Sequence, residues 1–206
     1  MHIPFLEIDL TALIIWAGYV GIFIIIFAEC GILLGIFLPG DSLLFTAGFL
    51  ASQGHLNLAL LMVICFAGAV LGDNFGYAFG RRVGPAIFKK EDSIFFHKNH
   101  LERAARFYDR HGGKTIILAR FMPIIRTFAP ILAGVGRMNY RVFILYNLAG
   151  GALWAIGLTA LGYFLGSVIP GVDKYLFPIV LMIIIISMLP GVIATLKSYI
   201  ARKKAQ

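Results

Sequence analysis

The sequence predicts an all-α polytopic membrane protein. Of its 206 residues, 60% are hydrophobic and only 14% are charged, whereas a soluble domain is nearer half apolar and a quarter charged. So large an apolar share cannot be hidden in the core of one small water-soluble domain, and lipid must therefore solvate much of the chain. The apolar residues also gather in runs of about 20, the length of helix that crosses a bilayer. We expect a single membrane domain over residues 1–206.

Four apolar runs predict transmembrane helices. Leu10–Ala28 contains no charged residue, and as a helix it would be about 28 Å long, close to the hydrocarbon thickness. Leu56–Gly80 contains one charged residue, Asp73, while Phe143–Leu165 and Leu176–Leu196 contain none. We therefore expect about four transmembrane helices.

Two other apolar stretches, residues 30–52 and 115–136, are interrupted by helix-breaking residues. A broken helix frees backbone groups that cannot face lipid, so it is tolerated at membrane depth only where protein or water surrounds it. We therefore expect each stretch to form a re-entrant hairpin of two half-helices. The expected breaks are Pro39, Gly40, Pro123 and Pro130.

The two hairpins resemble each other in sequence. Glu29 precedes Pro39 by ten residues, and Arg120 precedes Pro130 by ten. The spans that follow contain the similar segments GYAFG and GYFLG. One span and one hairpin, repeated, predict an inverted repeat with opposed hairpins, an architecture of secondary transporters that bind substrate between the halves. The two repeats would cover residues 10–80 and 115–166.

The basic residues predict the orientation. Of the 18 Lys and Arg residues, nine lie in residues 81–114 and four in the tail at 197–206, which follows the last predicted span at 175–196. Because positive residues collect on the cytoplasmic side, we expect both termini and the 81–114 segment there. Residues 98–111 have the pattern of an amphipathic helix in the cytoplasmic interface. Topology and anionic headgroups account for the net charge of +8, so no nucleic-acid partner is expected.

Five charged residues lie in or beside the apolar segments, where charge is expensive and usually functional. An arginine presents a fixed fork of donors that suits phosphate, which makes Arg120 and Arg126 candidate ligands of a lipid phosphate. The acids Glu29, Asp41 and Asp73 are candidates for binding protons or a sodium ion. A structural set of salt bridges that holds the hairpins together is the alternative.

Other classes of protein fit less well. No Ser or His lies beside another base at a useful spacing, and no acids are paired as D-x-x-D, so we expect no enzyme, no catalytic residue, no cofactor and no metal site. The soluble parts are too short for a tether. Glycine recurs every fourth residue from Gly68 to Gly80, which predicts a face for close helix packing.

Three motifs stand out in the sequence. The strongest is RHG at residues 110–112 followed by ARFxPxxRTxxPxxAG at 119–134. A second is GDxxxYxxGRxxG at 72–84, and a third is Glu29 with the PGD segment at 39–41. These motifs resemble those of the DedA family of membrane proteins, related to the wider group with a VTT (SNARE-associated) domain. The resemblance covers Ala28 to Phe143, more than half of the chain.

The resemblance implies a flippase that moves a polyprenyl phosphate such as undecaprenyl phosphate across the bacterial cytoplasmic (inner) membrane, coupled to the proton motive force. It also implies that the matching acids, Glu29 and Asp41, and the matching arginines, Arg120 and Arg126, are the functional residues. Expected partners are an anionic isoprenoid lipid or phospholipid, with protons or sodium, and the sequence leaves a homo-oligomer open. An uncoupled phospholipid scramblase is the alternative, followed by a membrane lipid phosphatase or an ion transporter.

Overall fold

The structure is a computed structural model that describes residues 10–32, 38–87 and 112–168. Every regular element within these ranges is a helix, which confirms the all-α prediction. The predicted interfacial helix at 98–111, the predicted span at 175–196 and both chain termini lie outside the described residues.

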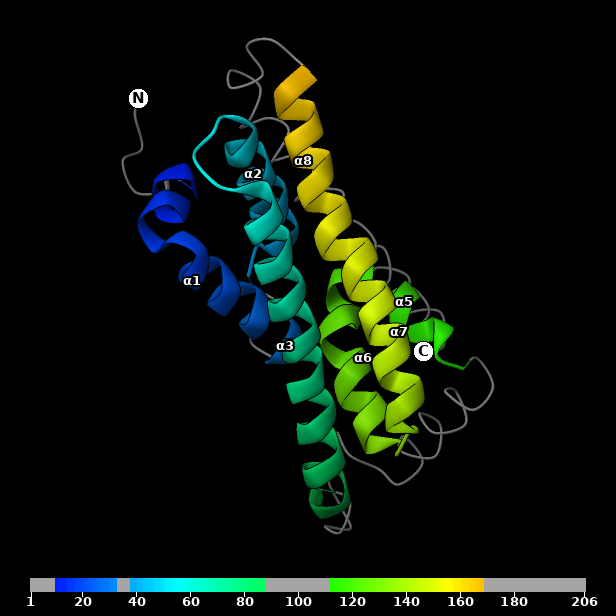
Figure 1. The fold of residues 1–206 in the computed structure, drawn as a ribbon. Helices are drawn as coiled ribbons and strands as arrows, with labels where there is room; N and C mark the ends of the chain where they lie inside the picture. Colours follow the sequence, from blue (N-terminus) through cyan, green and yellow to red (C-terminus); the bar gives the residue numbers. More distant parts are fainter. Residues whose placement is uncertain (1–9, 33–37, 88–111, 169–206) are drawn as a thin grey trace, which may run out of the picture.

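Long α3 runs through the middle of the molecule, with α1 packed on one flank and α6 on another (Figure 1). Helix α2 packs along α8. The π-helix η2 joins α7 to α8, so that these three form one continuous helical run. The elements are α1 (Leu10–Gly31), α2 (Gly40–Ser52), α3 (Leu58–Ile87), α5 (Lys114–Arg120), α6 (Pro123–Val135), α7 (Tyr140–Gly151), η2 (Ala152–Ile156) and α8 (Gly157–Val168).

Two helical runs in the described part are long and apolar enough to cross a membrane, Leu58–Val83 and Tyr140–Val168. They correspond to the second and third predicted spans. Each begins at an asparagine whose side-chain oxygen accepts a backbone N–H of the first turn: Asn57 from Leu60 at 3.0 Å and Asn139 from Arg141 at 2.9 Å. Asparagine at this position satisfies donors that the helix itself leaves free.

The first predicted span, Leu10–Ala28, differs in the structure. Helix α1 contains a break at Gly18, where φ is 57° and ψ is −157°. Only glycine adopts such a backbone readily, because it has no Cβ. The apolar helix after the break, Gly18–Gly31, is therefore too short to cross by itself. The prediction of one unbroken helix over this run is wrong.

The second interrupted stretch is a broken helix. Helix α5 ends at Arg120 and α6 begins at Pro123, with Phe121 and Met122 between them. Proline suits the first helical position because its fixed φ matches a helix and it lacks an N–H that would be unpaired there. The predicted break at Pro130 is wrong, since that residue lies inside α6. The break lies between α5 and α6, and α6 begins there at Pro123.

The first interrupted stretch also contains a break, at the predicted place. Helix α1 ends at Gly31 and α2 begins at Gly40, directly after Pro39. The Ser42 hydroxyl donates to the Pro39 carbonyl at 3.0 Å, which ties the first turn of α2 to its entry. Each predicted hairpin stretch thus contains a break after which a helix begins, directly after Pro39 in the first stretch and at Pro123 in the second. Their re-entrant placement in a bilayer, and the inverted repeat, remain predictions.

Two close crossings hold the halves of the chain together. At the crossing of α3 with α6, a Cβ on Gly80 would clash with the Ile131 carbonyl, and one on Gly134 with the Tyr77 carbonyl. The crossing of α2 with α8 has the same reciprocal form. There Gly48 contacts the Thr159 carbonyl and Gly162 contacts the Phe45 carbonyl. At both crossings, each glycine lies against the carbonyl three residues before the partner glycine, so each helix pair packs backbone to backbone.

The glycine stripe of α3 is a packing face, as predicted. Gly68 and Gly72 contact the backbone of α1, whereas Gly76 and Gly80 contact Ile131 of α6. One face of α3 therefore receives α1 along its first half and α6 along its second half. This arrangement places Asp73, between the two contacts, in the protein interior.

Candidate functional site

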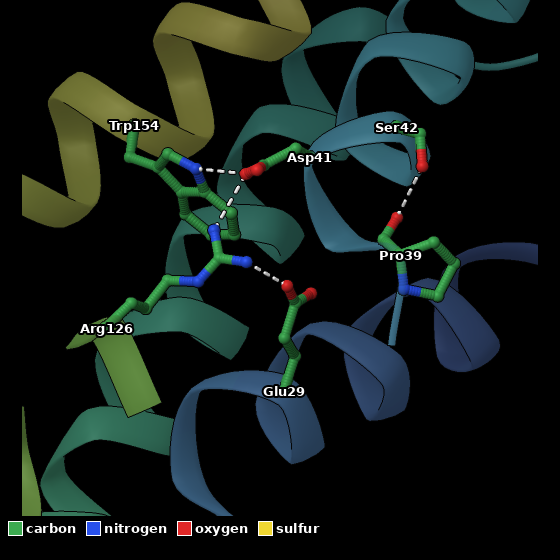
Figure 2. Close-up of polar contacts among 6 residues, drawn as sticks. All are labelled: Glu29, Pro39, Asp41, Ser42, Arg126 and Trp154. Atoms are coloured by element: carbon green, nitrogen blue, oxygen red, sulfur yellow. Dashed lines mark hydrogen bonds and ion pairs between the residues drawn. The ribbon is translucent and has the colours of Figure 1, made fainter. Parts of the chain in front are cut away.

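Arg126 of α6 is the centre of a buried polar group that joins three other helical elements (Figure 2). Its guanidinium donates to the Asp41 carboxylate at 2.7 Å through Nη1 and to the Glu29 carboxylate through Nη2. Arg126 and Glu29 are almost fully buried, and Asp41 is 18% exposed. Arg126 thus connects the end of α1 to the start of α2, on either side of the first predicted break.

Trp154 completes this group from the far end of the chain. Its indole N–H donates to Asp41 Oδ1 at 2.8 Å, and the Arg126 guanidinium lies 4.6 Å from the centre of its ring. The ring face therefore adds a cation–π contact. Trp154 belongs to η2, and insertion of a π-turn changes the direction in which a helix presents its side chains, a device often found at functional sites.

Gly40 is required by the position of Glu29. A Cβ at residue 40 would overlap the Glu29 carboxylate, so a larger residue there would force that carboxylate to move away from the start of α2. The predicted break residues Pro39 and Gly40 therefore have separate roles. Pro39 precedes the helix, and Gly40 makes room for a buried acid.

Arg120, at the end of α5, forms a second group. Its Nη2 donates to the Asp73 carboxylate of α3 and to the Asn147 side-chain oxygen of α7. The Asn147 amide in turn donates to the Val70 carbonyl at 3.1 Å. Gly150 lies against the aliphatic part of the Arg120 side chain. All of these polar side chains are buried.

We call the five ionisable residues of these groups the charge cluster: Glu29, Asp41, Asp73, Arg120 and Arg126. Both groups border the same face of α3, since α1 and α6 pack on that face on either side of Asp73. Among the described residues, three carboxylates face two guanidiniums, so full ionisation of these five groups would leave one excess negative charge in a largely buried site. Such a charge is costly, and a bound proton or cation would remove it.

The charge cluster also contains donors without acceptors. Three buried guanidinium nitrogens have no hydrogen-bond partner in the described part of the protein: Arg120 Nε, Arg120 Nη1 and Arg126 Nε. Nearly all buried polar groups in proteins are hydrogen-bonded, so each such group needs an explanation. Two buried carboxylate oxygens of the cluster, Glu29 Oε2 and Asp73 Oδ1, also lack a partner in the described residues, so the site holds unused donors and unused acceptors.

Helix α6 presents this chemistry on one face only. Arg126, Thr127 and Ala129 are buried, whereas Ile125 and Phe128 are about 40% exposed. The exposed face is apolar and suits contact with lipid. The break between α5 and α6 is also apolar and exposed, at Phe121 and Met122. A polar face and a lipid-facing face thus lie on opposite sides of one helix.

The structure brings all five predicted charged residues into this cluster, although their roles as ligands or proton carriers are not tested by it. Sequence reasoning missed two partners, Asn147 and Trp154. Asn147 is a polar residue within an apolar span, and this could have served as a signal. Trp154 gave no such signal, since an aromatic residue in a span is unremarkable. The glycines at 150–151, interpreted from sequence as packing, pack in part against Arg120.

Comparison with known proteins gives a consistent result. Residues 38–164 match the VTT domain. The chain is 45% identical to "Protein DedA" of Escherichia coli K12 over 193 residues, which is 93% of this chain and 87% of that protein. It is 45% identical over 89% of its length to an uncharacterized membrane protein of Mycobacterium leprae, of which 86% is covered. It is 35% identical over 90% of its length to "Inner membrane protein YghB" of Escherichia coli K12, of which 85% is covered. No solved structure matches.

Proposed function

Because the chain belongs to the VTT domain family and, within it, to the DedA membrane proteins, we propose that it transports lipid. The proposed substrate is a polyprenyl phosphate such as undecaprenyl phosphate. The lipid would cross the bacterial cytoplasmic (inner) membrane, driven by the proton motive force, in a protein whose two termini are cytoplasmic. The relatives are named as membrane proteins, and one as an inner membrane protein. The substrate and the coupling go beyond those names.

The three buried N–H groups of Arg120 and Arg126 that have no partner among the described residues are the observation on which the substrate class rests. A phosphate group offers several acceptor oxygens, and guanidinium pairs with phosphate through two parallel hydrogen bonds. The two arginines already share the charge cluster with three acids, so an arriving phosphate would compete with those carboxylates. We therefore expect the lipid phosphate to displace Glu29 or Asp41 from Arg126.

The charge of the cluster is the basis for the proposed proton coupling. Phosphate adds negative charge to a site where acids already outnumber arginines. A carboxylate displaced from its arginine is then most stable when it is protonated. Lipid binding and proton binding would favour each other, and such linkage is reciprocal. Protons and lipid phosphate should therefore move together, in the direction that the proton gradient drives.

The two faces of α6 suit a lipid with a charged head and a long tail. Arg126 would hold the phosphate on the buried face, while the tail stays in the membrane beside Phe128 and Leu132 on the exposed face. Arg120 and Arg126 are 2% and 4% exposed, so the structure represents a closed state of the site. Transport therefore requires α6 to separate from the start of α2, which breaks the Arg126–Asp41 pair.

The experiment is transport of undecaprenyl phosphate into liposomes that contain the purified protein, with and without an imposed pH gradient. We expect the wild type to concentrate the lipid in one leaflet only when the gradient is present. The variants Glu29→Gln and Asp41→Asn should lose this accumulation and still bind the lipid. Accumulation by both variants at the wild-type level would contradict coupling through these acids.

The alternative of an uncoupled phospholipid scramblase makes a different prediction in the same assay. A scramblase would equilibrate lipid between the leaflets at a rate independent of the gradient. That result for the wild type would remove the proposed coupling and leave the acids as structural partners of the arginines.

A further inference from the structure

A second candidate site lies away from the charge cluster, between the second half of α3 and the start of α7. It is a hollow of about 530 Å³, which is within the usual range of ligand pockets. The side chains of Arg81, Arg82 and Tyr140 on its wall are exposed, so it opens to the surface. Its lining consists of Asn74, Tyr77, Ala78, Arg81, Arg82 and Tyr140.

Hydrogen bonds fix the walls of this hollow. Arg81 Nη1 donates to the Tyr77 hydroxyl at 2.9 Å, and that hydroxyl donates to the Met138 carbonyl between α6 and α7. The Tyr140 hydroxyl donates to the Asn74 side-chain oxygen at 2.9 Å. Tyr77 is buried and stacks on Phe143, with ring centres 4.5 Å apart. The side chains of Tyr77, Arg81, Tyr140 and Asn74 are therefore held in place, as a binding site requires.

No acid among the described residues pairs with the arginines of the hollow. Within residues 10–32, 38–87 and 112–168 the acids are Glu29, Asp41 and Asp73, and each of them pairs with Arg120 or Arg126. Two further exposed arginines, at positions 137 and 141, lie near the same end of the molecule and add to its positive charge. A hollow whose described lining holds two arginines and no carboxylate suits an anion.

The surface that leads to the hollow is apolar. Leu71, Phe75, Ala78 and Arg82 follow one another at spacings of four, three and four residues, so they share one face of α3. Leu71 and Phe75 are each 50% exposed. An anion with an apolar tail could thus place its charged head in the hollow and its tail along this face, within a helix suited to span the membrane. A free phosphate would use only the hollow.

We propose that the hollow between α3 and α7 binds the phosphate headgroup of an anionic membrane lipid, with Arg81 and Arg82 as the principal ligands. Tyr140 and Asn74 would position the headgroup. This site is separate from Arg120 and Arg126, and it does not depend on transport through the charge cluster. It would hold lipid at the membrane surface on the side where α3 ends.

The test measures binding of phosphatidylglycerol to the purified protein in neutral detergent by native mass spectrometry, with phosphatidylcholine as the uncharged comparison. The variant Arg81→Gln/Arg82→Gln loses two charges in the hollow. The matched control, Arg137→Gln/Arg141→Gln, loses two charges from exposed arginines outside its lining. We expect about a tenfold loss of phosphatidylglycerol affinity in the first variant and less than about a threefold loss in the control.

The single variant Arg82→Gln tests whether a loss of binding comes from misfolding. Arg82 makes no hydrogen bond within the described part of the chain, so its replacement should leave thermal unfolding unchanged. We expect this variant to lose part of the phosphatidylglycerol affinity. Equal losses in the hollow variant and the control would show general attraction of anionic lipid and overturn the proposal. Competition by inorganic phosphate as strong as that by phosphatidylglycerol would overturn the lipid assignment. Binding at the wild-type level in Arg120→Lys would separate this site from the charge cluster, even if that variant transports nothing.

Discussion

Arg126 Nη1 and Asp41 Oδ1 lie 2.7 Å apart although 85 residues separate them in the chain. This pair connects the start of α2 to α6, and Glu29 adds the end of α1 to the same guanidinium. The two predicted hairpin stretches therefore meet through a single arginine.

Arg126→Lys should abolish most transport while the protein still inserts. A lysine keeps the charge, but its single ammonium group cannot reproduce the fork that contacts Glu29 and Asp41 and stacks on Trp154. We expect a loss of roughly tenfold or more, equivalent to one charge-assisted hydrogen bond. The measurement is liposome transport per inserted protein molecule. Arg141→Lys is the matched control at an exposed position, and activity near wild type in Arg126→Lys would show that charge alone suffices.

Asp73 and Arg120 should behave as one energetic unit. Asp73→Asn or Arg120→Gln alone leaves a buried charge without its partner, which costs about 3–5 kcal/mol. The double variant removes both charges and should be less destabilised than the sum of the single changes. Thermal unfolding of all four proteins in detergent measures this coupling. Additive effects would mean that the pair contributes no mutual stabilisation.

Gly134→Ala should strongly destabilise the fold, since the new Cβ would clash with the Tyr77 carbonyl at the crossing of α3 and α6. Overpacking of this kind costs about 1–3 kcal/mol. Gly157→Ala is the matched control, because a Cβ there meets nothing within 4 Å. It should be neutral or stabilising by up to about 1 kcal/mol. Loss of helical circular dichroism on heating reports both, and equal melting temperatures would rule out a tight crossing.

Trp154→Phe separates the two contacts of the indole. It removes the hydrogen bond to Asp41 and keeps an aromatic face for Arg126. A hydrogen bond to a charged group contributes about 1.5–3 kcal/mol, so we expect a clear loss of thermal stability. Trp154→Leu should lose more, and Leu153→Phe, at a neighbouring position that is 59% exposed, should lose little. A reversed order of the two Trp154 variants would exclude a role for the ring face.

Cysteine labelling tests the orientation. Both native cysteines in the described part, Cys30 and Cys65, are buried and should give little background. With the 81–114 segment in the cytoplasm, the predicted span over Leu56–Gly80 places His55 outside, and the predicted re-entrant stretch at 115–136 returns Arg141 to the cytoplasm. A membrane-impermeant maleimide should therefore label His55→Cys in intact cells and label Arg141→Cys only after permeabilisation. Labelling of Arg141→Cys in intact cells would reverse the predicted topology.

Much of this fold could be predicted because membrane helices follow local rules. Length and hydropathy identified the runs that became α3 and α7–α8, and Pro123 with Pro39 marked two helix starts. The kink at Gly18 could not be predicted, since a glycine in a helix is usually tolerated. The predicted break at Pro130 is wrong because a proline inside a helix breaks that helix only where packing does not compensate.

The charge cluster could likewise be predicted only in part. The cost of charge in lipid identified Glu29, Asp73 and Arg126 without any structure. Their pairing could not be predicted, because three acids and two arginines allow several arrangements. Trp154 lies in the π-turn of η2, which directs its side chain toward the cluster. A π-turn adds a single residue to a helical turn, and this leaves no reliable pattern in the sequence.

The pairing of the two halves also imposes an order of assembly. Glu29, Asp41 and Asp73 are synthesised first, and the arginines that neutralise them, Arg120 and Arg126, emerge from the ribosome only later. Helices α2 and α3 likewise form their glycine crossings only after α8 and α6, their partners there, have been synthesised. Until then the acids must be protonated or remain near water, since unpaired charge in lipid is costly. We therefore expect the first half to reach its final depth in the membrane only after the second half has been made.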